Sequence, residues 1–228
     1  MRKTTLTIAI FSLIFSLITL GITLLKSPKT AVKIFESSIS SVVELKAMTD
    51  EIESFGTAVI ISDTELITNF HVISYTNQGT SHIHSQLEIR FADQSDYITV
   101  SLVKYDEILD LALLSMEDKK GKSISFKNCD IVEGQTVYLM GNANNLGISI
   151  TSGIVSRGNI NIQNNTIENT YIQVDAASAN GVSGGALIDT YGHLIGILTL
   201  RILDNEGTPI YGYIFAIPIR TILEFLSA

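Results

Sequence analysis

The sequence predicts an all-β protein of the sandwich or barrel type. From Gly56 onward, short runs rich in β-branched and aromatic residues alternate with Gly, Asn, Asp and Ser turn signals. No long amphipathic helices separate these runs, which argues against a parallel sheet with crossover helices. With 46% hydrophobic residues among 228, the chain can bury a sizeable core, and intrinsic disorder is excluded as its general state.

The predicted strands follow one another closely along the chain. They are residues 57–62, 65–69, 86–92, 97–104, 110–116, 135–141, 149–157, 170–176, 185–189, 193–201 and 211–217. Residues 30–50 have one broad apolar side and favour a helix, with a stalk as the alternative. A last helix is expected from Pro218, a residue suited to a first helical turn, with Ile219, Ile222, Leu223 and Leu226 on one face.

The amino terminus carries an apolar run that is long enough to cross a bilayer. Residues 4–25 are 22 residues without a charge, preceded by Arg2 and Lys3. No small-x-small cleavage site follows, so an uncleaved single-pass anchor is favoured over a signal peptide. The domain prediction is an amino-terminal tip and anchor at 1–29, a linker or helix at 30–53, and one domain at 54–228. Its internal boundary is expected near 120–133.

The charge balance argues against nucleic acid as a partner. The formal net charge is −8, and residues 30–228 hold 11 basic against 23 acidic side chains. A surface that follows nucleic-acid phosphates is therefore not expected. Cys129 is the only cysteine, so no intrachain disulfide can form.

Three residues form a candidate constellation for nucleophilic catalysis. Ser183 lies in the sequence Gly-Val-Ser-Gly-Gly of residues 181–185, where flanking glycines permit a tight turn and a close approach of substrate. The α/β-hydrolase elbow shares this motif, but there the acid and His follow the Ser, and here only His193 follows it, too closely. Upstream, His71 follows a predicted hairpin, and Asp110 opens an apolar strand where an unpaired charge is costly. The order His, acid, Ser is typical of double-β-barrel proteases.

Several further motifs occur in the same order as in one known family. They are residues 56–61, 66–73, 110–114, 141–142, 151–156, 175–177, 181–187 and 215–218. Together they resemble the HtrA (Deg) family of trypsin-like serine proteases, over about residues 54 to 219. The resemblance implies two six-stranded antiparallel barrels with the active site between them, and peptide-bond hydrolysis in a bacterial extracytoplasmic setting.

The resemblance also implies roles for individual residues. Ser183 would be the nucleophile, His71 the general base and then acid, and Asp110 the group that holds the imidazole. The amides of Gly181 and Ser183 would form the oxyanion hole. Thr199 would support the acid, and Thr199, Leu200 and Arg201 would pair with substrate as an added strand. Ala177 occupies the place of the pocket-floor carboxylate of trypsin-like enzymes, which predicts cleavage after small aliphatic residues.

Two departures from the family pattern are informative. The family usually has Asn-Pro-Gly-Asn before the nucleophile, whereas residues 179–182 are Ala-Asn-Gly-Val, and losing the proline is expected to loosen the oxyanion loop. The chain stops 10 residues after Pro218, so a PDZ-less member is expected.

The leading hypothesis is a membrane-anchored serine endopeptidase that degrades unfolded or misassembled proteins in extracytoplasmic quality control. A catalytically silent peptide-binding or chaperone module on the same fold is the alternative from another class, and an esterase is a third hypothesis. No cofactor is expected and no metal, because His82 and His84 lack the other ligands of a zinc site. A homotrimer is a candidate assembly, because the family is often trimeric.

Overall fold

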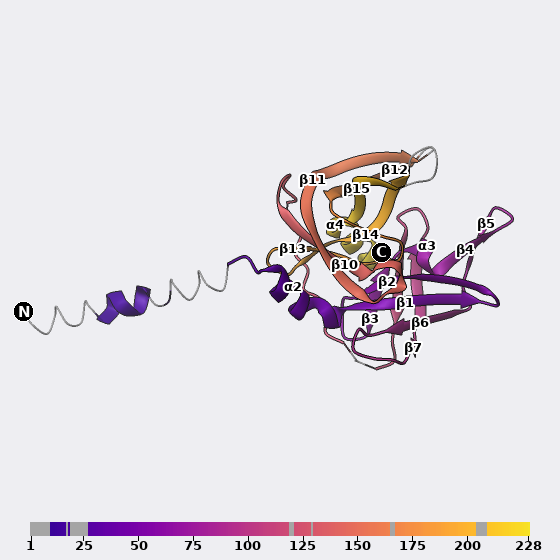
Figure 1. Cartoon of the computed structure of the whole chain (residues 1–228), viewed down its shortest axis with the longest axis horizontal. Helices are drawn as coiled ribbons and strands as arrows, with labels where there is room; N and C mark the ends of the chain where they lie inside the picture. Colours follow the sequence, from indigo (N-terminus) through magenta and orange to yellow (C-terminus); the bar gives the residue numbers. More distant parts are fainter. Residues whose placement is uncertain are drawn as a thin grey trace, which may run out of the picture.

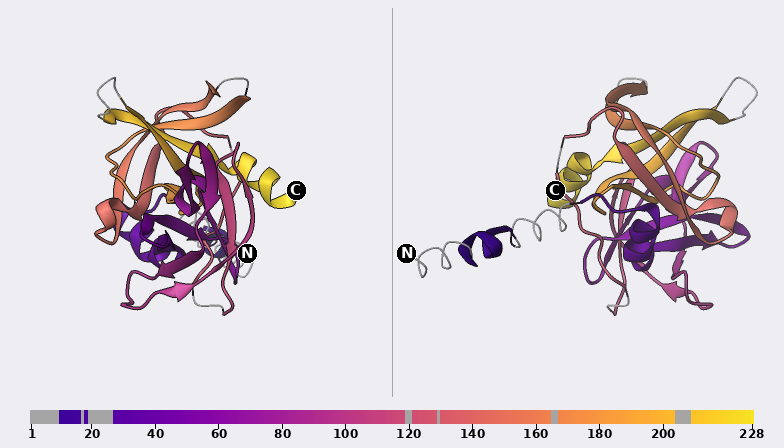
Figure 2. Two further views of the ribbon diagram at one scale, coloured as in Figure 1. Left: turned by 90° about the vertical axis from the view of Figure 1, so that its right-hand side faces the viewer. Right: turned by 60° about the vertical axis from the view of Figure 1, so that its left-hand side comes forward.

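The computed structural model describes residues 10–16, 18, 27–118, 121–128, 130–164, 167–203 and 209–228. Of residues 163, 164, 167, 200–203 and 209–213 it describes the backbone alone. The chain forms two curled antiparallel sheets, which lie one above the other in Figure 1 and can be followed from two further sides in Figure 2. The predicted all-β fold with a short carboxyl-terminal helix is confirmed.

The first sheet contains seven strands in the order β7-β6-β1-β2-β3-β9-β8. Their bounds are β1 Val42–Thr49, β2 Ile52–Ile60, β3 Glu65–Thr68, β6 Gln86–Arg90, β7 Ile98–Thr99, β8 Ser101–Asp106 and β9 Leu111–Ser115. The edge strands β7 and β8 are consecutive in the chain and are separated only by Val100. One segment that bends at Val100 therefore provides both edges, so the sheet is strongly curled. When this segment is counted as one strand, the sheet has the six strands that were predicted.

A closed six-stranded barrel forms the second half of the fold, as predicted. The strands pair in the order β10-β11-β12-β15-β14-β13. Their bounds are β10 Thr136–Asn142, β11 Ile148–Asn164, β12 Ile167–Asp175, β13 Ala186–Asp189, β14 Leu194–Leu203 and β15 Pro209–Pro218. The chain passes from the first sheet to this barrel over residues 116–135. A separate hairpin, β4 (Ser74–Asn77) with β5 (Thr80–Ile83), extends from the first half.

The helices α2, α3 and α4 pack with these strands, together with 3-10 turns at Ile39–Ser41 and Ala143–Asn145, and residues 10–16 are also helical. α2 (Ala31–Ser38) is capped at its amino end by Thr30, whose side chain accepts a hydrogen bond from the Lys33 amide. α3 (Phe70–Ile73) is a single turn that follows β3. α4 (Ile219–Ser227) follows Pro218 and buries Ile219, Ile222 and Phe225.

The helix predicted over residues 30–50 is wrong in its second half. α2 ends at Ser38, and residues 42–49 form β1, which pairs with both β2 and β6 in the centre of the first sheet. The residues predicted as a linker or helix at 30–53 therefore include a central strand. The spacing of the apolar residues in this segment also fits a helix. In the structure, the neighbouring residues Val42 and Val43 are both buried, because β1 is covered on both faces.

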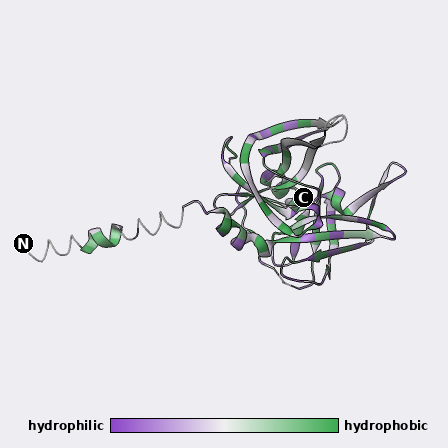
Figure 3. Cartoon of the chain, in the orientation of Figure 1, coloured by the Kyte–Doolittle hydropathy of each residue, from purple (hydrophilic) through white to green (hydrophobic). Residues whose placement is uncertain are grey.

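Apolar residues are buried in three clusters. One fills the first sheet's interior and includes Val43, Leu66 and Leu114, and another fills the second barrel and includes Val155 and Ile172. The third lies between the two halves, where α2 and α4 also contribute. On β11, hydrophobic and hydrophilic residues alternate, as Figure 3 shows. The layer between the halves fixes their relative position, on which a site built from both halves depends.

The predicted membrane anchor lies largely outside the described residues, which omit 1–9, 17 and 19–26. Within the part that is described, no helix has the length and apolar composition needed to span a membrane.

Candidate active site

His71 and Asp110 meet through a dense set of hydrogen bonds. His71 lies on α3 directly after β3, and Asp110 immediately precedes β9, the strand that pairs with β3. His71 Nδ1 lies 2.8 Å from Asp110 Oδ2 and 3.0 Å from Oδ1, and the His71 amide donates to Oδ1 at 2.9 Å. An ionised carboxylate only accepts hydrogen bonds, so Nδ1 carries the proton. In neutral His71 this leaves Nε2 able to accept a proton.

Two more residues hold the aspartate. Thr199 Oγ1 donates to Asp110 Oδ2 at 2.5 Å, and Asn69 Nδ2 donates to the Asp110 carbonyl at 3.0 Å. The Asp110 backbone adopts a φ of 55°, a left-handed conformation that aspartate tolerates better than most residues. The Asp110 side chain is 19% exposed, against 46% for His71. The carboxylate is therefore largely shielded and fully hydrogen-bonded, while the imidazole remains open to a reactant.

Ser183 lies close to the same pair, and Thr199 connects them. Ser183 Oγ donates to the Thr199 carbonyl at 3.3 Å, and the Thr199 hydroxyl is bonded to Asp110. Thr199 on β14 thus joins the predicted nucleophile to the predicted acid. Within the described chain, no hydrogen bond links Ser183 Oγ to His71 Nε2. Such bonds are often long in the absence of substrate and shorten when substrate binds.

The loop before Ser183 presents the backbone amides of Gly181 and Ser183, which, like that of Val182, have no partner in the described part of the chain. The carbonyl of Asn180 accepts from the Asn144 amide at 2.6 Å, and the carbonyl of Val182 accepts from the Gly185 amide at 2.9 Å. In a trans peptide the N–H points away from the carbonyl of the same unit. The two amides therefore point away from these contacts and remain available for an oxyanion.

Glycine is required in this loop for its backbone conformation. Gly181 has a φ of 88° and Gly184 a φ of 80°, values that strain any residue with a Cβ. A Cβ on Gly184 would also lie 2.0 Å from the Thr57 carbonyl oxygen, on the first sheet. The sequence signal that singled out Ser183 thus reflects a loop that closely approaches the other half of the fold.

The model of the trypsin-like peptidase domain matches residues 56–197. The chain belongs to this family. It is 35% identical over 176 residues to the probable periplasmic serine endoprotease DegP-like of Buchnera aphidicola, covering 74% of this chain and 35% of that protein. It is 35% identical over 182 residues to the serine endoprotease DegS of Escherichia coli, covering 78% and 48%.

Among solved structures, the HtrA-type protease AlgW with tripeptide matches this trypsin-like peptidase domain with a TM-score of 0.72 and 31% identity. The match covers 87% of this chain and 62% of that one. These comparisons confirm the resemblance to the HtrA (Deg) family. The chain spans about a third to a half of the length of these two curated relatives.

The residues predicted to contact substrate are described to different extents. Thr199 is buried, whereas the side chains of Leu200 and Arg201 lie outside the described residues. Ala177 lines a cavity of about 190 Å³, and neither Ser183 nor Thr199 is among its described lining residues. These are Leu139, Gly141, Ala143, Ser149, Thr151, Ala177, Ser178, Ala179 and Val182, none of which is charged.

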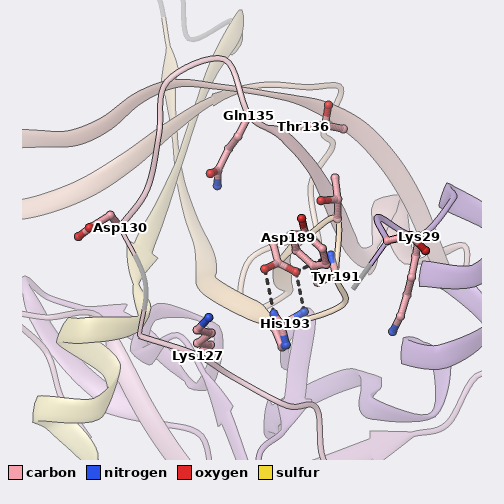
Figure 4. Close-up of a pocket in the computed structure, with 10 residues that line it drawn as sticks. Lys29, Lys127, Asp130, Gln135, Thr136, Asp189, Tyr191 and His193 are labelled. Carbon is pink, nitrogen blue, oxygen red and sulfur yellow. Dashed lines mark hydrogen bonds and ion pairs between the residues drawn. The ribbon is translucent and has the colours of Figure 1, made fainter. Parts of the chain in front are cut away.

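A second Asp–His pair lies in the turn between β13 and β14. His193 Nδ1 is 3.0 Å from Asp189 Oδ2, and the pair lines a cavity of about 690 Å³ together with Lys29, Lys127 and Tyr191 (Figure 4). The Lys29 amide donates to the Thr190 carbonyl at 2.6 Å, so the segment before α2 forms one side of the cavity. None of the residues predicted for catalysis is among its described lining residues.

Sequence reasoning missed three residues that support the site. Asn69 holds the Asp110 backbone, Asn142 is completely buried beside the loop, and Thr57 bonds to the loop from the first sheet. All three lie within the family motifs given above, but no role was predicted for any of them. Because each of the three acts through contacts that are distant in sequence, no local pattern distinguishes them.

Proposed function

We propose that this chain is a serine endopeptidase of the HtrA type, which hydrolyses peptide bonds of unfolded or misassembled polypeptides outside the cytoplasm. The observation that carries the proposal is the convergence at Thr199 of Asp110, which holds His71, and of Ser183. The serine endoprotease names of the relatives support the reaction class. The chemistry follows from the roles that these groups would take.

In the proposed acylation, Ser183 Oγ leaves the Thr199 carbonyl, transfers its proton to His71 Nε2 and attacks the scissile carbonyl carbon. The imidazolium is stabilised by Asp110, and the oxyanion is stabilised by the free amides of Gly181 and Ser183. His71 then gives the proton to the leaving amine as the peptide bond breaks. In deacylation, water adds to the acyl-enzyme with His71 as base, which releases the new carboxylate and regenerates Ser183.

The proposed specificity is for small aliphatic residues before the scissile bond. Ala177 brings no carboxylate to the position that it occupies in the resemblance, so a Lys or Arg side chain would lose hydration there without a charged partner. A Val, Ala, Ile or Leu side chain would instead gain roughly 1–3 kcal/mol from apolar burial. Backbone pairing of the substrate with residues 199–201 of β14 would position the bond.

The proposed location is the extracytoplasmic side of a bacterial membrane, with residues 4–25 as a single-pass anchor. The length of the uncharged run supports an anchor, and the periplasmic description of the Buchnera relative supports the compartment. A homotrimer is the assembly that we propose from the family resemblance alone.

The decisive experiment is labelling of the full chain with a fluorophosphonate probe, followed by cleavage of unfolded casein. Wild type should be labelled at Ser183 and should cut casein mainly after small aliphatic residues, whereas Ser183→Ala should do neither. Equal labelling of both proteins would contradict the assignment of the nucleophile. An unlabelled wild type that still binds casein would support the peptide-binding module instead.

A further inference from the structure

Thr57 contacts the loop of the predicted nucleophile from the other half of the fold. It lies on β2 of the first sheet and is completely buried. Its hydroxyl donates to the Gly181 carbonyl at 2.7 Å, and its amide donates to the Ser183 carbonyl at 2.9 Å. One residue therefore holds the carbonyl groups on both sides of Val182.

The hydroxyl proton of Thr57 can be donated only to the Gly181 carbonyl. The Asn142 amide donates to Thr57 Oγ1 at 2.9 Å, so the oxygen must act as acceptor there. The single hydroxyl proton is then committed to the Gly181 carbonyl. Asn142 is itself fixed, because it is completely buried, its Oδ1 accepts from the Gly147 amide at 3.0 Å and its Nδ2 donates to Glu44 at 3.3 Å.

The peptide unit that Thr57 holds lies between the amides of Gly181 and Ser183. The Gly181 amide belongs to the preceding unit and the Ser183 amide to the following one, and each of these units is fixed through its own carbonyl. The middle unit, from Gly181 to Val182, is fixed by the Thr57 hydroxyl. Because Gly181 is free to change its φ and ψ angles, this hydroxyl prevents the middle unit from rotating and misaligning the two amides.

We propose that Thr57 is a positioning residue for the oxyanion hole, acting through the Gly181 carbonyl. This inference rests on the proposed function, in which the Gly181 and Ser183 amides stabilise the oxyanion. It assigns to the first half of the fold a role in transition-state stabilisation, in addition to supplying His71 and Asp110. A purely structural role would be to satisfy buried polar groups where the two halves meet.

Thr57→Val is the informative variant, because it preserves shape and removes only the hydroxyl. We expect kcat to fall about 100-fold with little change in KM, comparable to the loss of one oxyanion donor. Thr57→Ser should restore kcat to within a few-fold of wild type. Thr68→Val is the matched control, since Thr68 is equally buried and its hydroxyl donates to the Thr57 carbonyl at 2.7 Å without bonding to residues 180–183.

A second measurement separates positioning from stability. A peptide aldehyde forms a hemiacetal with Ser183 and places an oxygen in the hole, whereas peptide binding in the Ser183→Ala background does not. Thr57→Val should weaken the aldehyde about 100-fold and leave peptide binding within twofold. Equal losses in both measurements, or a kcat no lower than that of Thr68→Val, would overturn the proposal. Absence of fluorophosphonate labelling at Ser183 in wild type would instead overturn the proposed function on which it rests.

Discussion

The two Asp–His pairs of this chain have similar geometry and different surroundings. His71 Nδ1 lies 2.8 Å from Asp110, and His193 Nδ1 lies 3.0 Å from Asp189. Asp110 is 39 residues from its histidine in sequence and also accepts the Thr199 hydroxyl. Asp189 is four residues from its histidine and accepts the amides of Tyr191 and His193 at 2.8 Å, so it stabilises its own turn.

The comparison teaches that an aspartate-bound imidazole is insufficient evidence for catalysis. At His71, the pair lies beside a serine and two free amides, supplied by the other half of the fold. At His193, the cavity is lined by Lys29, Lys127 and Asp130, and none of the residues predicted for catalysis is among its described lining residues. Function is therefore assigned by what surrounds the pair, and the two pairs can be tested against each other.

The largest expected difference is between the two histidines themselves. His71→Ala should lower kcat by a factor on the order of 10⁶, because loss of the base costs about as much as loss of the whole triad. His193→Ala should leave kcat within twofold of wild type. Steady-state cleavage of a chromogenic peptide measures both. A similar loss in the two variants would contradict the distinction drawn between the pairs.

Substitution of Asp110 should lower kcat, whereas substitution of Asp189 should lower the free energy of unfolding. Asp110→Asn should lower kcat by about 10⁴, because the amide no longer fixes the imidazole tautomer. Asp189→Asn should leave kcat unchanged and lower the free energy of unfolding by about 1–2 kcal/mol, because its turn loses charge-assisted hydrogen bonds. Kinetics and urea unfolding of both variants provide the test, and a catalytic defect in Asp189→Asn would contradict it.

A smaller effect is expected from the hydroxyl that only one pair possesses. Thr199→Val removes the donor to Asp110 Oδ2 and keeps the carbonyl that accepts from Ser183. One hydrogen bond to a charged group is worth about 1.5–3 kcal/mol, which corresponds to at least a tenfold loss of kcat if its effect is felt in the transition state. Thr199→Ser should retain most of the activity. An unchanged kcat in Thr199→Val would show that the bonds from His71 suffice to hold Asp110.

A third histidine, without any carboxylate partner, sharpens the comparison further. His84 is buried, its Nε2 lies 3.1 Å from Ser54 Oγ, and burial lowers its pKa. As the pH falls below about 6.5, His84 is protonated in the unfolded chain, whereas its lowered pKa keeps it neutral in the folded chain. The free energy of unfolding therefore decreases. His84→Gln should reduce this acid-dependent loss by about 1 kcal/mol or less. Urea midpoints at pH 7.5 and 5.5 test this, and equal losses in wild type and variant would contradict it.

The sequence predicted those features that depend on local patterns. The turn glycines around Ser183, the apolar strand after Asp110 and the helix after Pro218 each have a local signal, and each lies where it was expected. Residues 42–49 were mistaken for helix because a strand buried on both faces loses the alternation that identifies strands. Thr57 and Asn142 were missed because their function depends on partners from the other half of the fold.

The loop that lacks the family's proline contacts several neighbouring segments. Its expected loosening, with Asn180 in the place of that proline, stays a prediction. The carbonyls from Asn180 to Ser183 each accept a hydrogen bond, from Asn144, Thr57 and Gly185. These bonds oppose the loosening, in place of the restraint that a proline ring puts on its own backbone.

The apolar layer between the two halves is the place where heating would first disturb the candidate site. Ser183 and its loop belong to the second half of the fold, whereas His71, Asp110 and Thr57 belong to the first half. A small separation of the halves would break the contacts of Thr57 and Thr199 while leaving each sheet hydrogen-bonded within itself. Warming would then abolish the proposed peptidase activity at a temperature below that at which the two sheets unfold. Cooling would restore the activity without refolding of either half.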